Sequence, residues 1–458
     1  MTVRRPPTAS PAPAWGWAGA PHEIAEAFVF RRSAPAEGEG TSTLSPRWLR
    51  RSLSVSVAEG MLAEVVTACT GGAVLTAWAL HLGFGPAALG IVCALPIVAQ
   101  VFHLPAALLT QALGSRRLSL GAVALARLVW LALLAIPLLD LPLVAARAVF
   151  VGTVAASALL GVIGNNAWVA WMADLVPASM QGRYFGRRTA AATLCATASA
   201  LLTGVGVDHA RRVGAEEEML VALAVLAAAA GVGCFGLMAR QRDRRRSRRD
   251  TPPLATLLEP LRDPALRPLL AYQLAWNAAV GLGASFFALY MLRDLRMGFT
   301  LVTLHATAAA TARTLAAPAW GRLLDRVGGG RVLAACTFGL SATVLVWPML
   351  GPDLLWPLAI EAVVAGALWA GHGLALFGLP LRIAPPSALP AYVGALSSAA
   401  GLAFAVGAAA GSVLAAGSPG TIQLAGHTFS VLQGIFLLGA SMRLVAGGFA
   451  LRLLGPGR

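Results

Sequence analysis

Four ionisable side chains stand inside long apolar runs of this sequence, where a charge is costly and calls for a chemical reason. Glu59 and Glu64 belong to the first run, and Glu361 and His372 belong to a run nearer the C-terminus. A carboxylate in a partly dry cavity and an imidazole can both exchange protons near neutral pH. We therefore take all four as candidate proton-coupling groups, with Glu64 first and Glu59 second. The alternatives are a structural ion pair for the acids and a hydrogen-bonded core residue for His372.

Amides, indoles and one arginine form a second set of polar side chains within the apolar runs. Amides can fix a small polar solute by hydrogen bonds, and aromatic faces can cover it. An arginine near the middle of a run can meet an anionic solute or a glutamate. The same amides can instead join neighbouring helices without any solute. The candidates for a solute cavity are Asn165, Asn166, Gln273, Trp276, Asn277, Trp369 and Arg443.

The composition of the chain predicts the secondary-structure elements that position these side chains. The chain is 57% hydrophobic and 12% charged, whereas a soluble domain carries about 25% charged residues. Backbone groups in lipid must be satisfied internally, and about 20 helical residues cross the hydrocarbon core. We therefore expect an all-α polytopic membrane protein with twelve transmembrane helices. The predicted spans are 53–81, 87–112, 119–138, 143–172, 187–207, 216–239, 268–292, 299–320, 331–350, 354–378, 391–416 and 428–453.

Arginine sets the expected orientation, because the chain has no lysine and a formal net charge of +15. Most arginines fall on one side of the predicted membrane, and the side rich in basic residues is cytoplasmic. They include Arg116, Arg117, Arg183, Arg187 and Arg188. Twelve spans then place both termini in the cytoplasm and the chain in the cell (inner) membrane. This topology explains the basic charge without a nucleic-acid partner. Arg127 and Arg313 lie inside spans, in their cytoplasmic halves, where they can snorkel or pair with acids of the gate.

A repeated pattern divides the chain into two halves. Pro177, Tyr184 and Gly186 have the spacing P-x6-Y-x-G, and the same spacing returns at Pro385, Tyr392 and Gly394. Parallel repeats of this kind are a transporter architecture, with the solute site between the halves. We expect a mostly disordered cytoplasmic tail, a six-helix bundle, a basic cytoplasmic linker and a second six-helix bundle. Their ranges are 1–50, 51–239, 240–267 and 268–454.

With these features the sequence resembles the major facilitator superfamily. The most specific match is the loop "GRLLDRVGGGR", which resembles the family's motif of glycine, an Asp-Arg pair, glycine and basic residues. The matching residues are Gly321, Asp325, Arg326, Gly328 and Arg331. The first-half copy has Gln111 where the motif has the acid. The loop after the fourth span resembles a second family motif through Asp174, Arg183 and Arg187.

The resemblance implies a fold of two six-helix bundles and a cytoplasmic gate. Asp325 and its neighbouring arginines would make charged contacts in one conformation and break them in another. The first, fourth, seventh and tenth spans would line the cavity. The signatures of drug exporters and of sugar porters are both absent, so the resemblance does not identify a subfamily.

The function expected from these observations is secondary active transport of a small solute by alternating access, coupled to protons. The sequence has no G-x-x-x-x-G-K-[ST] loop for nucleotide, and its five cysteines show no metal-site spacing. We expect no cofactor, no metal, no enzyme activity, a monomer in the lipid bilayer, and a small-molecule substrate with protons as partners. Export of amphipathic, drug-like compounds is an alternative. A polytopic membrane enzyme or a sensor without transport is an alternative of a different class.

Overall fold

The computed structural model describes residues 46–176, 181–241, 259–384, 389–417, 421–424 and 427–454, and helices cover every predicted span in this part of the chain. The helices of the first half are α2 (Pro46–Thr70), α3 (Gly72–His81), α4 (Pro86–Val98), α5 (His103–Leu113), α6 (Ser115–Leu128), α7 (Ala135–Leu138), α8 (Leu143–Leu175), α9 (Gln181–Val213) and α10 (Glu216–Ala239). Short 3-10 turns, Ala99–Phe102 and Val129–Leu134, join α4 to α5 and α6 to α7.

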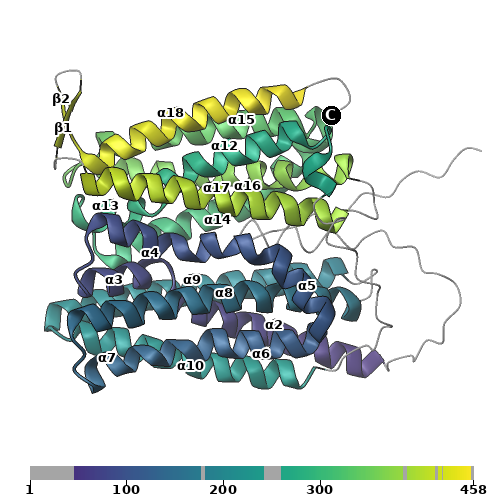
Figure 1. The fold of residues 1–458 in the computed structure, drawn as a ribbon, viewed down its shortest axis with the longest axis horizontal. Coiled ribbons are helices and arrows are strands. Elements are labelled where there is room, and N and C mark those ends of the chain that lie inside the picture. The colour runs from purple at the N-terminus through teal and green to yellow at the C-terminus, as the bar shows by residue number, and fades with distance from the viewer. Residues whose placement is uncertain are drawn as a thin grey trace, which may run out of the picture.

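The second half repeats this arrangement and adds one β-hairpin. Its helices are α12 (Arg267–Ala284), α13 (Phe286–Arg293), α14 (Phe299–Val327), α15 (Gly329–Val344), α16 (Trp356–Ile383), α17 (Leu389–Gly417) and α18 (Val431–Leu451), with 3-10 turns at Glu259–Arg262, Trp347–Met349 and Arg452–Leu454. Strands β1 (Thr421–Leu424) and β2 (His427–Ser430) pair antiparallel between α17 and α18. In Figure 1 this hairpin lies at one end of the molecule and the C-terminus at the other. We call the end that carries the hairpin the hairpin end. We call the opposite end, which carries the C-terminus, the arginine end.

Ten helical segments in the described residues are long and apolar enough to cross a membrane. The segments over the second and eighth predicted spans are helical too, but they do not meet the same standard of length and apolarity. In the second, the α-helix is interrupted between Val98 and His103. In the eighth, α14 is long enough but carries His305, Arg313 and several threonines, which make it less apolar. Both segments lie among the other helices in Figure 1.

The first predicted span, 53–81, is not one continuous helix. It begins earlier, at Pro46, and divides at Gly71 into α2 and α3. Gly72 has a φ of +51°, a conformation that side chains with a Cβ adopt only at a cost. This glycine therefore ends α2 near the middle of the predicted span.

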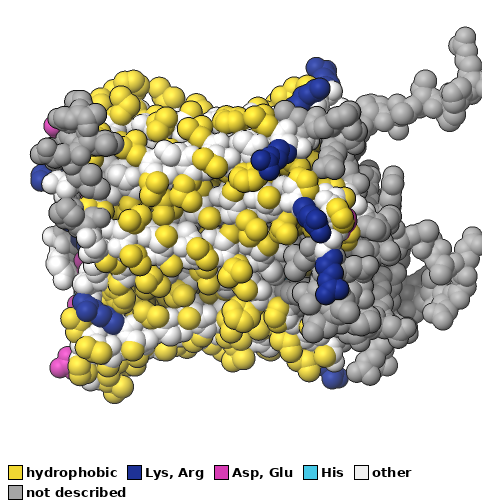
Figure 2. Space-filling model, turned by 45° about the horizontal axis from the view of Figure 1, so that its top comes forward, with side chains coloured by type: hydrophobic (Ala, Val, Ile, Leu, Met, Phe, Trp, Pro, Cys, Tyr) yellow, Lys and Arg dark blue, Asp and Glu magenta, His cyan; other side chains and the backbone are white. Residues whose placement is uncertain are grey.

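The surface of the molecule has the character of a membrane protein. Figure 2 shows a broad face of hydrophobic side chains between two ends where the charged side chains gather. Large apolar side chains are exposed well beyond what water would favour, such as Leu138 at 77%, Val144 at 80% and Leu315 at 75%. Contiguous exposed apolar surface of this kind marks contact with lipid or a partner. The chain is a multi-pass membrane protein.

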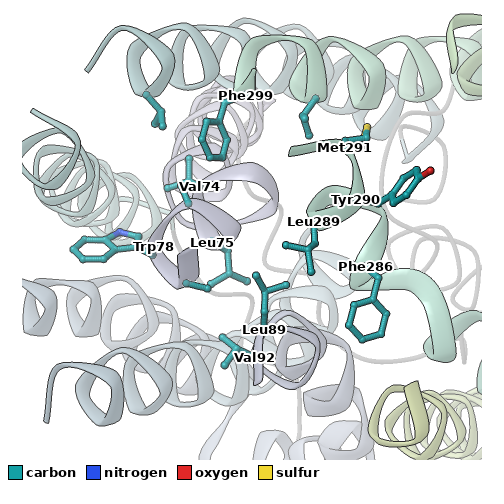
Figure 3. Close-up of a cluster of buried hydrophobic side chains, with 14 of the residues drawn as sticks. Val74, Leu75, Trp78, Leu89, Val92, Phe286, Leu289, Tyr290, Met291 and Phe299 are labelled. Atoms are coloured by element: carbon teal, nitrogen blue, oxygen red, sulfur yellow. The ribbon is translucent and has the colours of Figure 1, made fainter. Parts of the chain in front are cut away.

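The two halves meet through an apolar seam towards the hairpin end. One buried cluster contains residues of α3 and α4 from the first half and of α13 and α14 from the second. Figure 3 shows its central members: Val74, Leu75, Trp78, Leu89, Val92, Phe286, Leu289, Met291 and Phe299. The described clusters near the arginine end differ, because each belongs to one half alone. Apolar contact therefore joins the halves most strongly at one end.

An aspartate of the first half caps a helix of the second half beside this seam. The backbone N–H groups of Phe299 and Thr300 donate to the two carboxylate oxygens of Asp208 at 2.7 and 2.8 Å, and the Thr300 hydroxyl donates at 2.5 Å. A Cβ on Gly298 would lie 2.8 Å from the carboxylate, so this position needs glycine. The negative charge also complements the positive end of the α14 dipole. Asp208 thus fastens α9 to the start of α14.

We expect Asp208→Ala to destabilise the protein by about 1–3 kcal/mol, because it leaves two helix-terminal N–H groups without their acceptor. The melting temperature of the purified protein in detergent measures this loss. Asp353→Ala is the matched control, because Asp353 is an exposed acid near the same end. Equal melting temperatures for the two variants would show that the cap contributes nothing.

Candidate functional site

A buried carboxylate is held between two arginines inside the first half. Glu59 lies on α2 and is 3% exposed. Its Oε1 is 3.4 Å from Nη2 of Arg127 on α6, and its Oε2 is 3.6 Å from Nη2 of Arg188 on α9. The three side chains meet because α2 packs against α9 and α10, and α10 packs against α6. They form an ion triad with two positive groups and one negative group.

The triad lines a pocket of about 150 Å³. The other lining residues are Ala63, Val123, Ala126, Gly161, Asn165, Trp168 and Met238. The guanidinium of Arg188 lies 4.3 Å from the ring centroid of Trp168, within cation–π distance. Among the described atoms, Glu59 Oε2 and Arg127 Nη1 are buried without a hydrogen-bond partner. The pocket therefore combines polar groups with unused bonding capacity and an aromatic wall.

The repeated tyrosines make different contacts in the two halves. Tyr184 donates to the hydroxyl oxygen of Ser56 at 2.6 Å, inside the first half. Tyr392 donates to the carboxylate of Asp263 at 2.6 Å, at the arginine end of the second half. Hydrogen bonds from Tyr392 and from the Ala265 N–H hold the pKa of Asp263 below its usual value. Both tyrosines anchor helix ends, which fits an architectural reason for the repeat.

Aromatic rings surround a histidine in the second half. The hydroxyl of Tyr272 lies 2.7 Å from Nε2 of His372 and 2.8 Å from the hydroxyl of Thr337. The centroid of the His372 ring lies 4.7 Å from that of Trp276 and 5.2 Å from that of Trp369. Helices α12, α15 and α16 supply these side chains. The sequence predicts a cavity or coupling role for Trp276, Trp369 and His372, and the structure brings these three into one cluster.

Two arginines flank this cluster without a carboxylate in direct contact. The guanidinium carbon of Arg443 lies 5.8 Å from the Trp276 centroid, and that of Arg313 lies 5.9 Å from the Trp369 centroid. Both charges act on His372, and the charge of Glu361 acts on Arg443. Arg443 is 5% exposed, and its Nε has no hydrogen-bond partner in the described part of the chain. Both guanidiniums lie within cation–π distance of an indole ring.

Glu361 pairs with a histidine of the neighbouring helix. Its Oε2 lies 2.9 Å from Nε2 of His305 on α14, and it is 8% exposed. The His305 ring meets the Trp347 ring edge to face at 5.8 Å between centroids. The pair lies nearer the hairpin end than Arg443, because Glu361 follows closely on the first residue of α16. Glu361 is thus one member of a buried acid–histidine pair.

The remaining candidates from the sequence lie apart from these clusters. Glu64 is half-buried on α2 and does not line the pocket. Asn166 points away from its neighbour Asn165 and bonds to the second predicted span, through Thr110 and the backbone of His103. Gln273 and Asn277 bond to each other one helical turn apart, at 3.1 Å between side chains. Both arrangements are the helix-to-helix or local use of amides.

The gate motif lies at the arginine end. Asp325 and Arg326 are exposed, and Asp325 makes no ion pair with any residue that the structure describes. Gly328 has a φ of +88° between α14 and α15, which explains its place in the motif. The nearby motif residues Gly321, Arg331 and Arg187 are described, with Arg187 exposed. The side chains of Asp174 and Arg183 lie outside the described residues.

Sequence reasoning missed the partners of Glu59. Arg188 counts towards the cytoplasmic arginines in the sequence, yet its side chain bends inwards to the carboxylate. The sequence also does not predict a site role for Tyr272, Arg313 or Asp208. The signal that was available is the cost of a buried charge. Each buried acid requires a nearby cation, and Arg127 and Arg188 were the arginines within reach.

Comparison with known proteins rests on the fold. No protein-family model matches the sequence, and no curated protein sequence matches it. A solved structure of the nucleoside transporter NupG matches with a TM-score of 0.63 and 13% identity, over 88% of this chain and 99% of that one. A variant of NupG matches with a TM-score of 0.66, 12% identity and the same coverage. A variant of the E. coli fucose:proton symporter FucP matches with a TM-score of 0.56 and 14% identity, over 90% and 100% of the two chains.

The chain has the major facilitator fold. All three matches extend over almost the whole of the solved chains, so the likeness covers both halves together. Twelve helices in two six-helix bundles, as expected from the sequence, describe this fold. Within the major facilitator fold of this chain, the triad lies in the first bundle and the aromatic cluster in the second.

We expect Tyr272→Phe to lower the melting temperature clearly, because it leaves the buried His372 nitrogen without its partner. An unsatisfied buried polar group costs about 1–3 kcal/mol. Thermal unfolding of the purified protein in detergent measures the effect. Tyr392→Phe is the matched control, since it removes a hydroxyl that bonds to a carboxylate outside the core. If the control destabilises the protein as much as Tyr272→Phe, burial of the histidine pair is not the cause.

Proposed function

We propose that this protein is a secondary active transporter, which moves a small polar solute by alternating access with protons as the coupling ion. The observation that carries the proposal is the one-sided joining of the two halves. The apolar seam ties α3 and α4 to α13 and α14, while the described clusters at the arginine end stay within their own half. Two bundles joined in this way can rock about a central region and expose it to one side at a time.

The arginine end is proposed to face the cytoplasm of a cell (inner) membrane, with both termini on that side. The positive-inside rule supports this orientation. The seam then closes the external face, and the protein is in an inward-facing conformation. The exposed Asp325 fits this conformation, because a gate contact expected to alternate would be released here. A monomer is sufficient for this mechanism, since each bundle supplies one wall of the central region between them.

Proton coupling is proposed for the acids of α2. Glu59 is buried between two arginines, and Glu64 lies about 7.5 Å further along the helix axis, at 1.5 Å per residue. When a carboxylate in such a place takes up a proton, it loses its charge and its ion pairs weaken. Protonation is therefore linked to helix packing. The names of the structural neighbours agree with this class, since one is a nucleoside transporter and another a fucose:proton symporter.

Flux measurements test the proposal. We expect proteoliposomes containing the protein to take up at least one solute from a panel of nucleosides, sugars and short carboxylates when a proton gradient is imposed. Glu64→Gln should abolish the gradient dependence, because the amide cannot exchange a proton. Asp353→Asn is the control, as it makes the same chemical change on an exposed loop. Transport would be contradicted if no solute moves, and proton coupling by Glu64 if the variant keeps the full gradient dependence.

Export of amphipathic compounds is a second candidate. The cluster of Trp276, Trp369 and His372 beside two guanidiniums favours it, because flat apolar compounds bind to aromatic walls. Growth in the presence of toxic compounds distinguishes the two directions. Greater resistance in cells that produce the protein would favour export, and unchanged resistance would favour import.

A further inference from the structure

We propose that the pocket of Glu59, Arg127 and Arg188 binds a small carboxylate anion, which replaces Glu59 on the two guanidiniums when Glu59 takes up a proton. This inference rests on the proposed function, because it names a substrate class for that transporter. It goes beyond the coupling role of an acid by assigning the two arginines as the anion ligands. The pocket, its charge, its unused hydrogen-bonding atoms and its size each contribute to the argument.

The charge of the pocket favours an anion. Its lining holds two guanidiniums and one carboxylate, and the other lining residues are neutral. The lining therefore carries one net positive charge while Glu59 is ionised. A buried positive charge attracts an anion strongly, since there is little solvent to screen it. Neutral solutes gain nothing from this excess.

The ion pairs in the triad are long enough to be exchanged. Charge-assisted N–H···O bonds are typically about 2.7–2.9 Å, whereas Glu59 lies 3.4 and 3.6 Å from its two partners. The described ion-pair contacts join one nitrogen of each arginine to the carboxylate. Nη1 of Arg127 is buried and has no acceptor among the described atoms. A second carboxylate would supply this missing acceptor.

The size and walls of the pocket indicate a short-chain carboxylate. A cavity of 150 Å³ is known to hold benzene in another protein, and this pocket has about the same volume. Val123, Ala126 and Met238 can cover a few carbon atoms, and the indole of Trp168 forms a wall beside Arg188. A short carboxylate fits within the pocket whole.

The exchange keeps the buried charge constant. In the empty pocket the charges are those of Arg127, Arg188 and ionised Glu59. When a proton binds to Glu59 and the anion enters, the anion replaces the lost negative charge and the sum is unchanged. Adding the proton alone would leave both guanidiniums without a counter-charge, which is costly. Adding the anion alone would leave it and the ionised Glu59 competing for the same guanidinium nitrogens. The anion and one proton therefore enter together, and their joint movement is electroneutral.

In the described lining of the pocket, no ionisable side chain other than the triad faces Glu59. Helix α6 contributes Arg127, and α9 contributes Arg188 together with the hydroxyl of Tyr184, which bonds to Ser56. Helix α10 contributes the thiol of Cys234, which donates to the backbone oxygen of Glu59 at 3.6 Å. Helix α8 contributes the neutral Asn165 and Trp168. On α2 itself, Glu64 lies outside the pocket lining.

Calorimetric titration of the purified full-length protein in detergent, with propionate and propionamide as the probes, tests the proposal. The two have nearly the same shape and differ in charge. We expect propionate to bind and propionamide not to bind. Propionate affinity should rise as the pH falls, because a proton on Glu59 vacates the arginines. Affinity that is equal for both probes, or independent of pH, would overturn the proposal.

Two substitutions sharpen the test. Glu59→Gln should bind propionate at about pH 8 at least about tenfold more tightly than the unsubstituted protein, and without pH dependence. Arg127→Met should lose binding, and its aliphatic chain preserves the packing of the arginine stem against Gly231. The matched control is Arg116→Met, because Arg116 lies on the same helix, α6, but outside the pocket. Arg127→Met with undiminished binding would overturn the assignment.

Flux separates this proposal from the proposed function. If propionate does not bind but proteoliposomes still transport a neutral solute, the anion site is wrong and the transporter stands. If propionate binds with the expected pH dependence but no solute crosses the membrane, the site stands and transport is contradicted. Propionate uptake that carries no net current would support both, as the electroneutral step requires.

Discussion

The structure depends on the cost of placing charge away from water. Most described arginines lie at the ends of the molecule, where they reach solvent, and few enter the bundles. Those that do enter have compensation: Arg127 and Arg188 share Glu59, and Arg443 lies over an indole. A buried ion without such a partner would cost several kcal/mol. The same cost makes the interior charges the places where binding and protonation can change the energy most.

The two bundles meet this cost in different ways. The first uses an acid, which brings a titratable group and a pocket into the centre of its helices. The second uses aromatic rings around Arg313 and Arg443, and places its acid Glu361 with a histidine nearer the hairpin end. The halves repeat in fold and loop pattern but not in this chemistry. A division of labour follows naturally, with exchangeable charge in one half and aromatic surface in the other.

Contact between the halves uses little charge. The seam is apolar. Within the second half, Gly407 and Gly411 of α17 approach the backbone of α12 closely. Two charged residues of α9 take part in the contact between the halves: the Asp208 carboxylate meets backbone N–H groups of α14, and the Arg211 guanidinium lies 4.9 Å from the Phe299 ring centroid. Apolar surfaces slide and separate without leaving unpaired ions. A joint of this composition suits the rocking motion that the proposed function requires.

The sequence by itself determined the membrane class, the helical spans, the two-part repeat and the glycine at Gly328, because each follows from composition, from length or from local backbone preference. It also indicated Glu59, His372, Trp276 and Arg443 as unusual residues, since polar groups in apolar runs are visible without a structure. Only the tertiary structure decided which of them meet. The inward bend of Arg188, the cap made by Asp208 and the separation of Asn165 from Asn166 depend on helix rotation and packing across long distances in the chain. The periodicity of the sequence does not encode these contacts, because an almost uniformly apolar helix buries a similar apolar surface in many rotations about its axis. The few charged side chains and their partners decide which rotation the helix adopts.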